Sequence, residues 1–150
     1  MDPDHLAVYR SFNSHKVKYL LVGGLAAVLY GSPRLTKDLD LFIEPTLENA
    51  TRALEALKAA HFGTAELTTP QQLLAHEVTL FQDYVRLDLL TVLKGIAFKE
   101  AWRHRVTKEI HGVRFPVISM DHLIQSKKAV ARSIDLEDVK VLQKLRARKI

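Results

Sequence analysis

The fold is decided by the stretch Val22-Gly-Gly-Leu-Ala-Ala-Val-Leu-Tyr-Gly-Ser-Pro-Arg-Leu-Thr-Lys-Asp-Leu-Asp-Leu-Phe-Ile43. Its first residue ends a short apolar strand predicted over residues 18–22, which stops at the pair Gly23-Gly24. Residues 25–30 are apolar and contain alanine, which favours a short buried helix. A glycine pair between a strand and a helix can bring backbone amides close to phosphate oxygens, although a simple tight turn would use the same residues.

Asp38 and Asp40 open a second predicted strand, residues 38–44, at the end of this stretch. Side chains two residues apart on a strand point to the same face, so both carboxylates enter one space. Two like charges held close together are unfavourable unless a cation lies between them, and hard oxygen ligands suit magnesium better than zinc. An exposed strand face, on which both aspartates contact water, would give the same pattern.

A third carboxylate, Asp88, lies in an otherwise apolar strand pattern over residues 85–90. A buried carboxylate without a partner is costly, so Asp88 needs a positive neighbour. One solution is a salt bridge to Arg86 or to a nearby lysine. The other is a metal site shared with Asp38 and Asp40, in which three carboxylates hold two ions.

The remaining patterns alternate between helices and strands. Helices are predicted over 4–15, over 47–60 with Thr46 as the N-cap, over 120–132 and over 136–148. Strands are predicted over 78–81, 85–90, 106–110 and 113–118, the last two turning at His111-Gly112. Asp135 is expected to cap the final helix, with Asp138 in the capping-box position. This order indicates one α/β (α+β) domain over residues 1–150, a small mixed sheet flanked by helices, on which the helices of residues 120–148 pack.

The composition excludes several classes of protein. The chain is 47% hydrophobic and 26% charged, as in soluble globular proteins, and it has no apolar run of about 18 residues that could span a membrane. The absence of cysteine excludes disulfides and thiolate metal sites. A P-loop kinase is excluded because no Gly-x-x-x-x-Gly-Lys-Ser/Thr loop occurs. The acidic N-terminus does not resemble a secretion signal, so we expect a cytoplasmic protein.

The formal charge of +5 is concentrated in residues 94–114 and in the last ten residues. The first region suits an anionic ligand such as a nucleoside triphosphate or RNA, whereas the second fits a solvated helix face better. Trp102 and Phe98 are expected to serve in helix packing rather than as a platform on which nucleic-acid bases stack. The histidines lack metal-ligand spacing and are expected to be surface or packing residues: His61, His76, His104, His111 and His122.

Taken together, these segments resemble the DNA polymerase β-like nucleotidyltransferase superfamily, whose signature is a strand, a Gly-Gly or Gly-Ser turn, a short helix and an Asp-hydrophobic-Asp strand, followed by a later aspartate. Residues 30–40 are similar to the abortive-infection toxin branch and its small relatives. Residues 121–127, Arg132 and residues 135–139 resemble the closing helices of that branch. Many superfamily members have serine where this chain has Gly24, but the toxin-like branch commonly has glycine.

The resemblance implies a set of roles. Gly23 and Gly24 would hold the triphosphate, while Asp38, Asp40 and Asp88 would bind two magnesium ions. Asp88 would also help to deprotonate the attacking hydroxyl. Phosphate contacts are implied for three further residues, although the first two could simply fix their loop and the third could be an ordinary surface lysine: Arg34, Thr36 and Lys127. Arg132 and Asp138 could be catalytic, or could pair with other residues or cap helices.

The function implied is magnesium-dependent transfer of a nucleotide from a nucleoside triphosphate to an acceptor hydroxyl on RNA, protein or a small molecule. The toxin-like branch implies a toxin of a toxin–antitoxin or abortive-infection system, with an antitoxin or a second subunit as its partner. The alternative is an inactive domain of the same fold that binds a nucleotide or a protein partner. A nucleic-acid-binding protein that relies only on its positive charge would leave the three aspartates unexplained.

Overall fold

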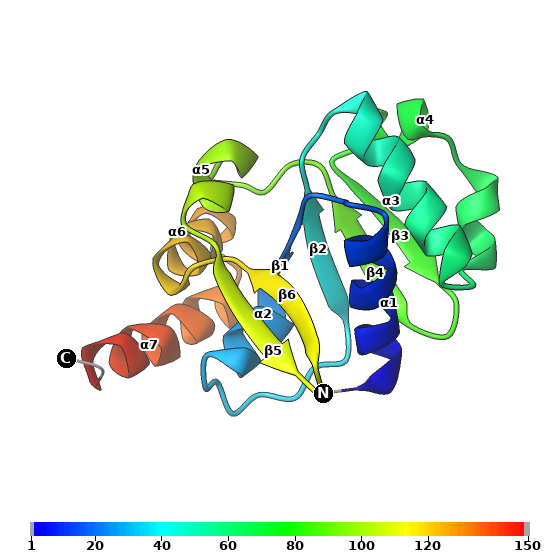
Figure 1. The fold of residues 1–150 in the computed structure, drawn as a ribbon. Coiled ribbons are helices and arrows are strands. Elements are labelled where there is room, and N and C mark those ends of the chain that lie inside the picture. Colours follow the sequence, from blue (N-terminus) through cyan, green and yellow to red (C-terminus); the bar gives the residue numbers. More distant parts are fainter. Residues whose placement is uncertain (1, 149–150) are drawn as a thin grey trace.

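A mixed six-stranded sheet organises residues 2–148, the part of the chain that the computed structural model describes (Figure 1). The strand order is β3-β4-β2-β1-β6-β5, in which β2 pairs with β4 and β1 with β6 in parallel. The strands are β1 Tyr19–Val22, β2 Leu39–Ile43, β3 Val78–Gln82, β4 Arg86–Leu90, β5 Val106–Ile110 and β6 Val113–Val117.

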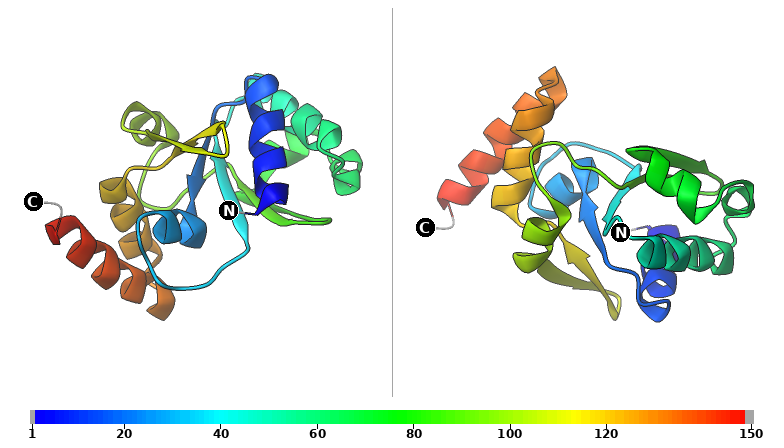
Figure 2. Two further views of the ribbon diagram at one scale, coloured as in Figure 1. Left: turned by 60° about the horizontal axis from the view of Figure 1, so that its bottom comes forward. Right: turned by 90° about the horizontal axis from the view of Figure 1, so that it is seen from above.

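Helices cover both faces of this sheet (Figures 1 and 2). Their bounds are α1 Pro3–Ser14, α2 Gly23–Leu29, α3 Leu47–Ala59, α4 Pro70–Ala75, α5 Phe98–Arg103, α6 Met120–Val130 and α7 Ser133–Arg148, with a short 3₁₀ helix at Gly63–Leu67. The two closing helices, α6 and α7, pack against each other, and α6 also contacts α2. No described helix is long and apolar enough to cross a membrane. Lys149, the end of the predicted C-terminal basic stretch, lies outside the described residues.

The alternation of side chains along β2 separates a core face from a functional face. Leu39, Leu41 and Ile43 are fully buried on the core face. The β1–β2 register pairs Tyr19 with Ile43, and α1 packs Phe12 edge-on against Tyr19 with ring centroids 5.2 Å apart. The opposite face carries Asp40 and is covered at its other end by α5. The face left open around Asp40 is therefore available for a site.

Local signals account for most element boundaries. The Thr46 hydroxyl accepts a hydrogen bond from the Asn49 amide at 3.2 Å, which confirms the predicted cap of α3. His111 and Gly112 both have positive φ, 49° and 78°, as a two-residue hairpin turn of the type favoured between antiparallel strands requires. The helices α4 and α5 were not predicted because each has six residues, too few for a helical hydrophobic period.

The predicted starts of α7 and β2 each differ from the structure, and both differences concern aspartates near the site. Asp135 does not cap the last helix, because α7 already begins at Ser133 and Asp135 lies in its first turn. Its carboxylate instead reaches back to accept a hydrogen bond from the Arg132 amide at 3.2 Å. Asp138 likewise forms long-range ion pairs in place of a capping box. Asp38 directly precedes β2, which begins at Leu39.

Candidate active site

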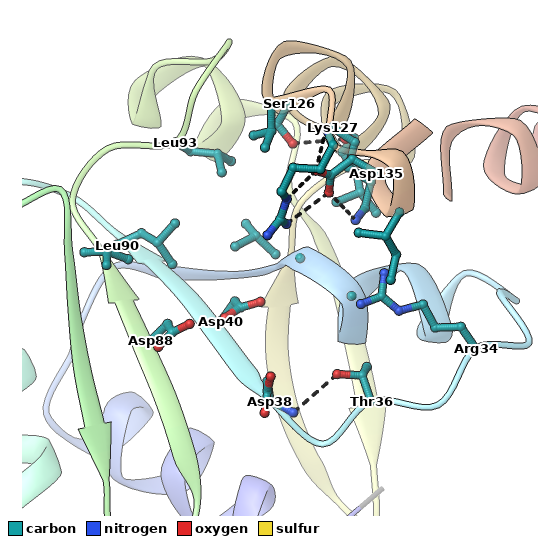
Figure 3. Close-up of a pocket in the computed structure, with 18 of the residues that line it drawn as sticks. Arg34, Thr36, Asp38, Asp40, Asp88, Leu90, Leu93, Ser126, Lys127 and Asp135 are labelled. Carbon is teal, nitrogen blue, oxygen red and sulfur yellow. Dashed lines mark hydrogen bonds and ion pairs between the residues drawn. The ribbon is translucent and has the colours of Figure 1, made fainter. Parts of the chain in front are cut away.

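A cavity of about 420 Å³ opens between the functional face of the sheet and the closing helices (Figure 3). Strands β1, β2, β3 and β4 line it on one side, and the loop after α2 together with α6 and α7 lines it on the other. The cavity brings together every residue that the sequence predicted for the site: Gly23, Gly24, Arg34, Thr36, Asp38, Asp40, Asp88 and Lys127.

The sheet register places two of the three aspartates side by side. Asp40 and Asp88 are directly paired in the parallel β2–β4 ladder, so their side chains point to the same face. Asp38 lies at the exposed entrance of the same cavity, where its amide donates a 3.4 Å hydrogen bond to the Thr36 hydroxyl (Figure 3). Among residues 2–148, no three carboxylate or histidine side chains gather closely enough to hold a metal ion by themselves.

The surroundings of Asp40 favour the binding of a cation next to its carboxylate. Burial, together with the neighbouring Asp88 carboxylate, raises the pKa of Asp40 to about 7. The predicted alternative partner for Asp88 is not found, because no described lysine or arginine, Arg86 included, forms a salt bridge with it. Two facing carboxylates with only oxygen donors suit a hard divalent cation such as magnesium. Asp40 and Asp88 are the residues that would hold it, with Asp38 beside them.

Both glycines of the pair lie very close to charged side chains of the cavity. Gly23 has a φ of +71°, and a β-carbon placed on it would lie 2.2 Å from Asp40 Oδ2. A β-carbon on Gly24 would lie 2.7 Å from Arg34 Nη2, so the Arg34 guanidinium packs directly on this glycine. A larger residue at this position would have to displace the Arg34 guanidinium. The pair is thus more than a tight turn, because it makes room for one anionic and one cationic group.

Replacing Gly23 with alanine tests this arrangement. The substitution is expected to abolish the activity of the site, because the new methyl group must displace the Asp40 carboxylate. It should also cost about 1 kcal/mol of stability, since alanine is strained at positive φ. Gly112→Ala is the matched control, because Gly112 has a similar φ of +78° but nothing within 4 Å of an added β-carbon. Equal losses of activity in the two variants would show that backbone strain, not contact with Asp40, is responsible.

A buried ion network forms the wall opposite the carboxylates. Lys127 is only 5% exposed, and its Nζ lies 2.7 Å from Asp138 Oδ2 and 3.7 Å from Asp135 Oδ1. Arg34 binds the same Asp138 oxygen, and Arg132 binds both oxygens of Asp135, with its Nε 2.7 Å from Oδ2. Lys127 is therefore not an ordinary surface lysine. Arg34 does fix its loop, but it also lines the cavity.

The network holds three cations against two carboxylates. Asp135 and Asp138 are 3% and 4% exposed, so neither is screened by water. Burial alone would raise the pKa of Asp135, but the hydrogen bonds and charge of Arg132, with the charge of Lys127, lower it overall. Asp135 therefore stays ionised, and the wall keeps one surplus positive charge that faces the cavity. A wall of this kind attracts an anion with several oxygens.

The basic side chains of residues 94–114 have several different partners. The Lys108 ammonium lies 5.4 Å from the centre of the Tyr30 ring, whereas the Arg105 guanidinium stacks on Trp102 at 4.0 Å. Trp102 stacks on Phe98 with ring centroids 5.6 Å apart, which confirms the predicted packing role. Two further arginines of the stretch pair with glutamates on the surface, Arg103 with Glu100 and Arg114 with Glu109.

The sequence left open whether Arg132 and Asp138 pair, and in the structure both do, Arg132 with Asp135 and Asp138 with Arg34 and Lys127. The ion pairs of Asp135 were not predicted, because its position fits a helix cap. The aliphatic side of the cavity comes from four separate elements and their connections, and no sequence motif marks it: Val78, Leu90, Leu93, Val130 and Ile134.

Comparisons with known proteins identify a family and a solved structure of similar fold. The family model described as "Nucleotidyl transferase of unknown function (DUF2204)" matches residues 3–150. The crystal structure of TM1012, a proposed nucleotidyltransferase from Thermotoga maritima, has a TM-score of 0.58 and 16% identity, over 94% of this chain and 89% of that chain. At this identity the similarity shows the fold alone. Comparison with curated protein sequences gives no significant match.

The class of the protein follows from these findings. The mixed sheet, its flanking helices and the matching solved structure confirm the predicted nucleotidyltransferase fold, and the family model makes the chain a nucleotidyltransferase. Since that model covers nearly its whole length, the chain belongs to the DUF2204 family of nucleotidyl transferases.

Proposed function

We propose that this enzyme uses magnesium to move a nucleotide from a nucleoside triphosphate to an acceptor hydroxyl. The observation that carries the proposal is the cavity in which the paired Asp40 and Asp88 face the cations Arg34 and Lys127. Bound magnesium would neutralise the carboxylates and polarise the phosphate oxygens. The cationic wall supplies the complementary charge for the rest of the triphosphate.

We assign a separate role in the reaction to each group of residues. Gly23 and Gly24 keep the cavity wall free of side chains, so the phosphates can come close to Arg34 and Lys127. Asp38 and Asp40 would hold the metal, which would supply the positive charge that orients the triphosphate. Asp88 lies on the far side of Asp40 from the glycine pair, where it can accept the proton of the attacking hydroxyl. Thr36 is a further phosphate contact at the cavity entrance.

We further propose that the enzyme belongs to the toxin-like branch and acts in a toxin–antitoxin or abortive-infection setting. The support is the similarity of residues 30–40 and of the closing helices to that branch. In this chain those two segments meet, because Arg34 of the first binds Asp138 of the second. An antitoxin or a second subunit would then be the partner protein.

Calorimetric titration tests the proposal. Each of ATP, GTP, CTP and UTP is titrated into the protein with and without magnesium, and the Asp38→Ala/Asp40→Ala double variant is measured alongside. We expect magnesium-dependent binding that the double variant loses. Asp83→Ala serves as the control, because Asp83 is an exposed carboxylate in the turn before β4. Undiminished binding by a folded double variant would contradict the site, and an absence of binding by the unmodified protein would favour the inactive alternative.

A further inference from the structure

Of the three aspartates of the site, Asp38 is the one that the sheet does not hold. Asp40 is paired with Val22 of β1 and with Asp88 of β4, so its backbone is fixed from both sides. Asp38 comes before Leu39, the first residue of β2, and its side chain is exposed at the entrance of the cavity. A metal ligand needs a fixed direction, so contacts outside the sheet have to place Asp38.

Such contacts are found on the peptide group that precedes Asp38. Its carbonyl oxygen, on Lys37, lies 3.1 Å from His5 Nε2, and its amide, on Asp38, donates a 3.4 Å hydrogen bond to the Thr36 hydroxyl. A peptide group is planar, so contacts at both ends restrict its rotation and with it the direction of the Asp38 side chain. Thr36 lies in the same loop, whereas His5 lies 32 residues before Lys37, on α1. Of the two contacts, that of His5 therefore ties the peptide group to another element.

The helix α1 gives His5 a rigid support. His5 lies in the first turn of α1 and is only 3% exposed. The helix also buries Val8, Tyr9 and Phe12. The Tyr9 ring stacks on Phe115 of β6, with ring centroids 4.3 Å apart, which fixes α1 to the sheet. Because α1 begins beside the loop that leads into β2, a hydrogen bond from His5 places this loop relative to the sheet (Figure 1).

The ring of His5 is committed to this single hydrogen bond. A carbonyl oxygen can only accept, so Nε2 carries the proton. Burial lowers the pKa of His5 below its ordinary value, which keeps the ring neutral and leaves Nδ1 without a proton. Nδ1 is buried and has no hydrogen-bond partner among residues 2–148, which costs stability. A leucine would avoid this cost, so what a histidine adds at this position is the directed donor to Lys37.

We propose that His5 is a positioning residue that orients Asp38 for magnesium through the Lys37 carbonyl. This inference rests on the proposed magnesium-dependent transfer and adds a residue that does not line the cavity. The hydrogen bond restrains the peptide group between Lys37 and Asp38, so the Asp38 carboxylate is held toward Asp40 before the metal arrives. Without the bond the loop keeps its other anchor, Arg34 on Asp138, but this lies further from Asp38 in the chain.

Thermal unfolding across a magnesium titration, above pH 7, tests the effect on the metal site. The rise in melting temperature with magnesium gives an apparent dissociation constant. His5→Leu should raise this constant by at least about tenfold, the usual effect of removing a partner that orients a metal ligand. His5→Gln should stay within about threefold of the unmodified protein, because its side-chain amide can donate to the Lys37 carbonyl in place of Nε2. Val8→Ala is the control for lost stability, since Val8 is fully buried on the same helix.

Amide hydrogen exchange without magnesium tests the contact itself. In His5→Leu the Asp38 amide should exchange at least about tenfold faster than in the unmodified protein, because the peptide group has lost its restraint from α1. Val8→Ala should leave the exchange of this amide unchanged, since it removes packing from α1 without removing the hydrogen bond. If His5→Leu does not fold, His5→Ala takes its place in both measurements.

The outcomes separate this inference from the function on which it rests. His5 has only a packing role if the leucine variant binds magnesium as well as Val8→Ala does, or if His5→Gln is impaired as much as His5→Leu. Unchanged exchange of the Asp38 amide in His5→Leu would equally overturn the inference. A lack of any response to magnesium in the unmodified protein would instead contradict the proposed function itself.

Discussion

Asp40→Asn is expected to lower the rate of nucleotidyl transfer by at least about a hundredfold while making the metal-free protein more stable. The activity falls because asparagine cannot supply the second negative charge that the proposed magnesium site needs beside Asp88. The stability rises because the unmodified protein keeps two facing carboxylates in a half-buried site, where burial and the Asp88 charge raise the cost of ionising Asp40. Opposite effects on activity and stability are typical of a residue that is retained for function.

The stability difference should depend on pH in a defined direction. Burial and the Asp88 charge raise the pKa of Asp40 from 3.8 to about 7 in the folded chain. Between these values the folded protein binds a proton that the unfolded chain has released, so the unmodified protein loses stability as the pH rises through this window. The asparagine of the variant has no such proton to release. The advantage of the Asp40→Asn variant should therefore be small near pH 4 and largest above pH 7.

Thermal unfolding at several pH values, with and without magnesium, measures this effect. Magnesium should raise the melting temperature of the unmodified protein above pH 7 and leave that of Asp40→Asn nearly unchanged. Glu109→Gln, an exposed carboxylate of β5 outside the cavity, is the control and should follow the unmodified protein. A variant that is less stable than the unmodified protein at every pH would mean that Asp40 has a structural partner.

Asp138→Asn is expected to destabilise the fold by about 3 kcal/mol, a typical cost of breaking a buried ion pair. The Lys127 ammonium is nearly fully buried and would keep only Asp135, at 3.7 Å, as a charged partner. Arg34 would lose the carboxylate that ties the loop after α2 to α7. The loss of stability should be smaller when magnesium and a triphosphate are present, because the phosphates supply the missing negative charge to both cations.

Chemical denaturation measures this loss against a matched pair. Asp121 also pairs with an arginine across α6 and α7, since its Oδ1 lies 2.7 Å from Arg146 Nη1, but both side chains are exposed. Asp121→Asn should therefore cost less than about 1 kcal/mol. Equal costs for the two variants would contradict the buried character of the Asp138 network.

The local part of the site could be predicted from the sequence. The segment from Val22 to Ile43 places its strand, glycine turn and helix by short-range rules, and the i, i+2 spacing of Asp38 and Asp40 follows from strand geometry. Asp88 is distant in sequence, but a lone aspartate in an apolar strand indicated a buried partner. Its pairing with Asp40 follows from the β2–β4 register, which no local pattern specifies.

The long-range part could not be predicted in the same way. The sequence around Asp135 fits a helix cap, and only the packing of α7 on α6 turns its carboxylate toward Lys127. Arg34 allowed two interpretations, loop support or ligand binding, and in the folded chain it both binds Asp138 and lines the cavity.

The central claim, that the enzyme transfers a nucleotide, is tested most directly by comparing labels. Parallel reactions contain magnesium and the bound triphosphate labelled either at the α-phosphate or at the γ-phosphate, with protein extract and RNA as acceptors. The structure-based account predicts that the acceptor retains only the α label, that pyrophosphate is released in equal amount, and that Asp40→Asn abolishes both. Retention of the γ label, or equal labelling by Asp40→Asn, would contradict it.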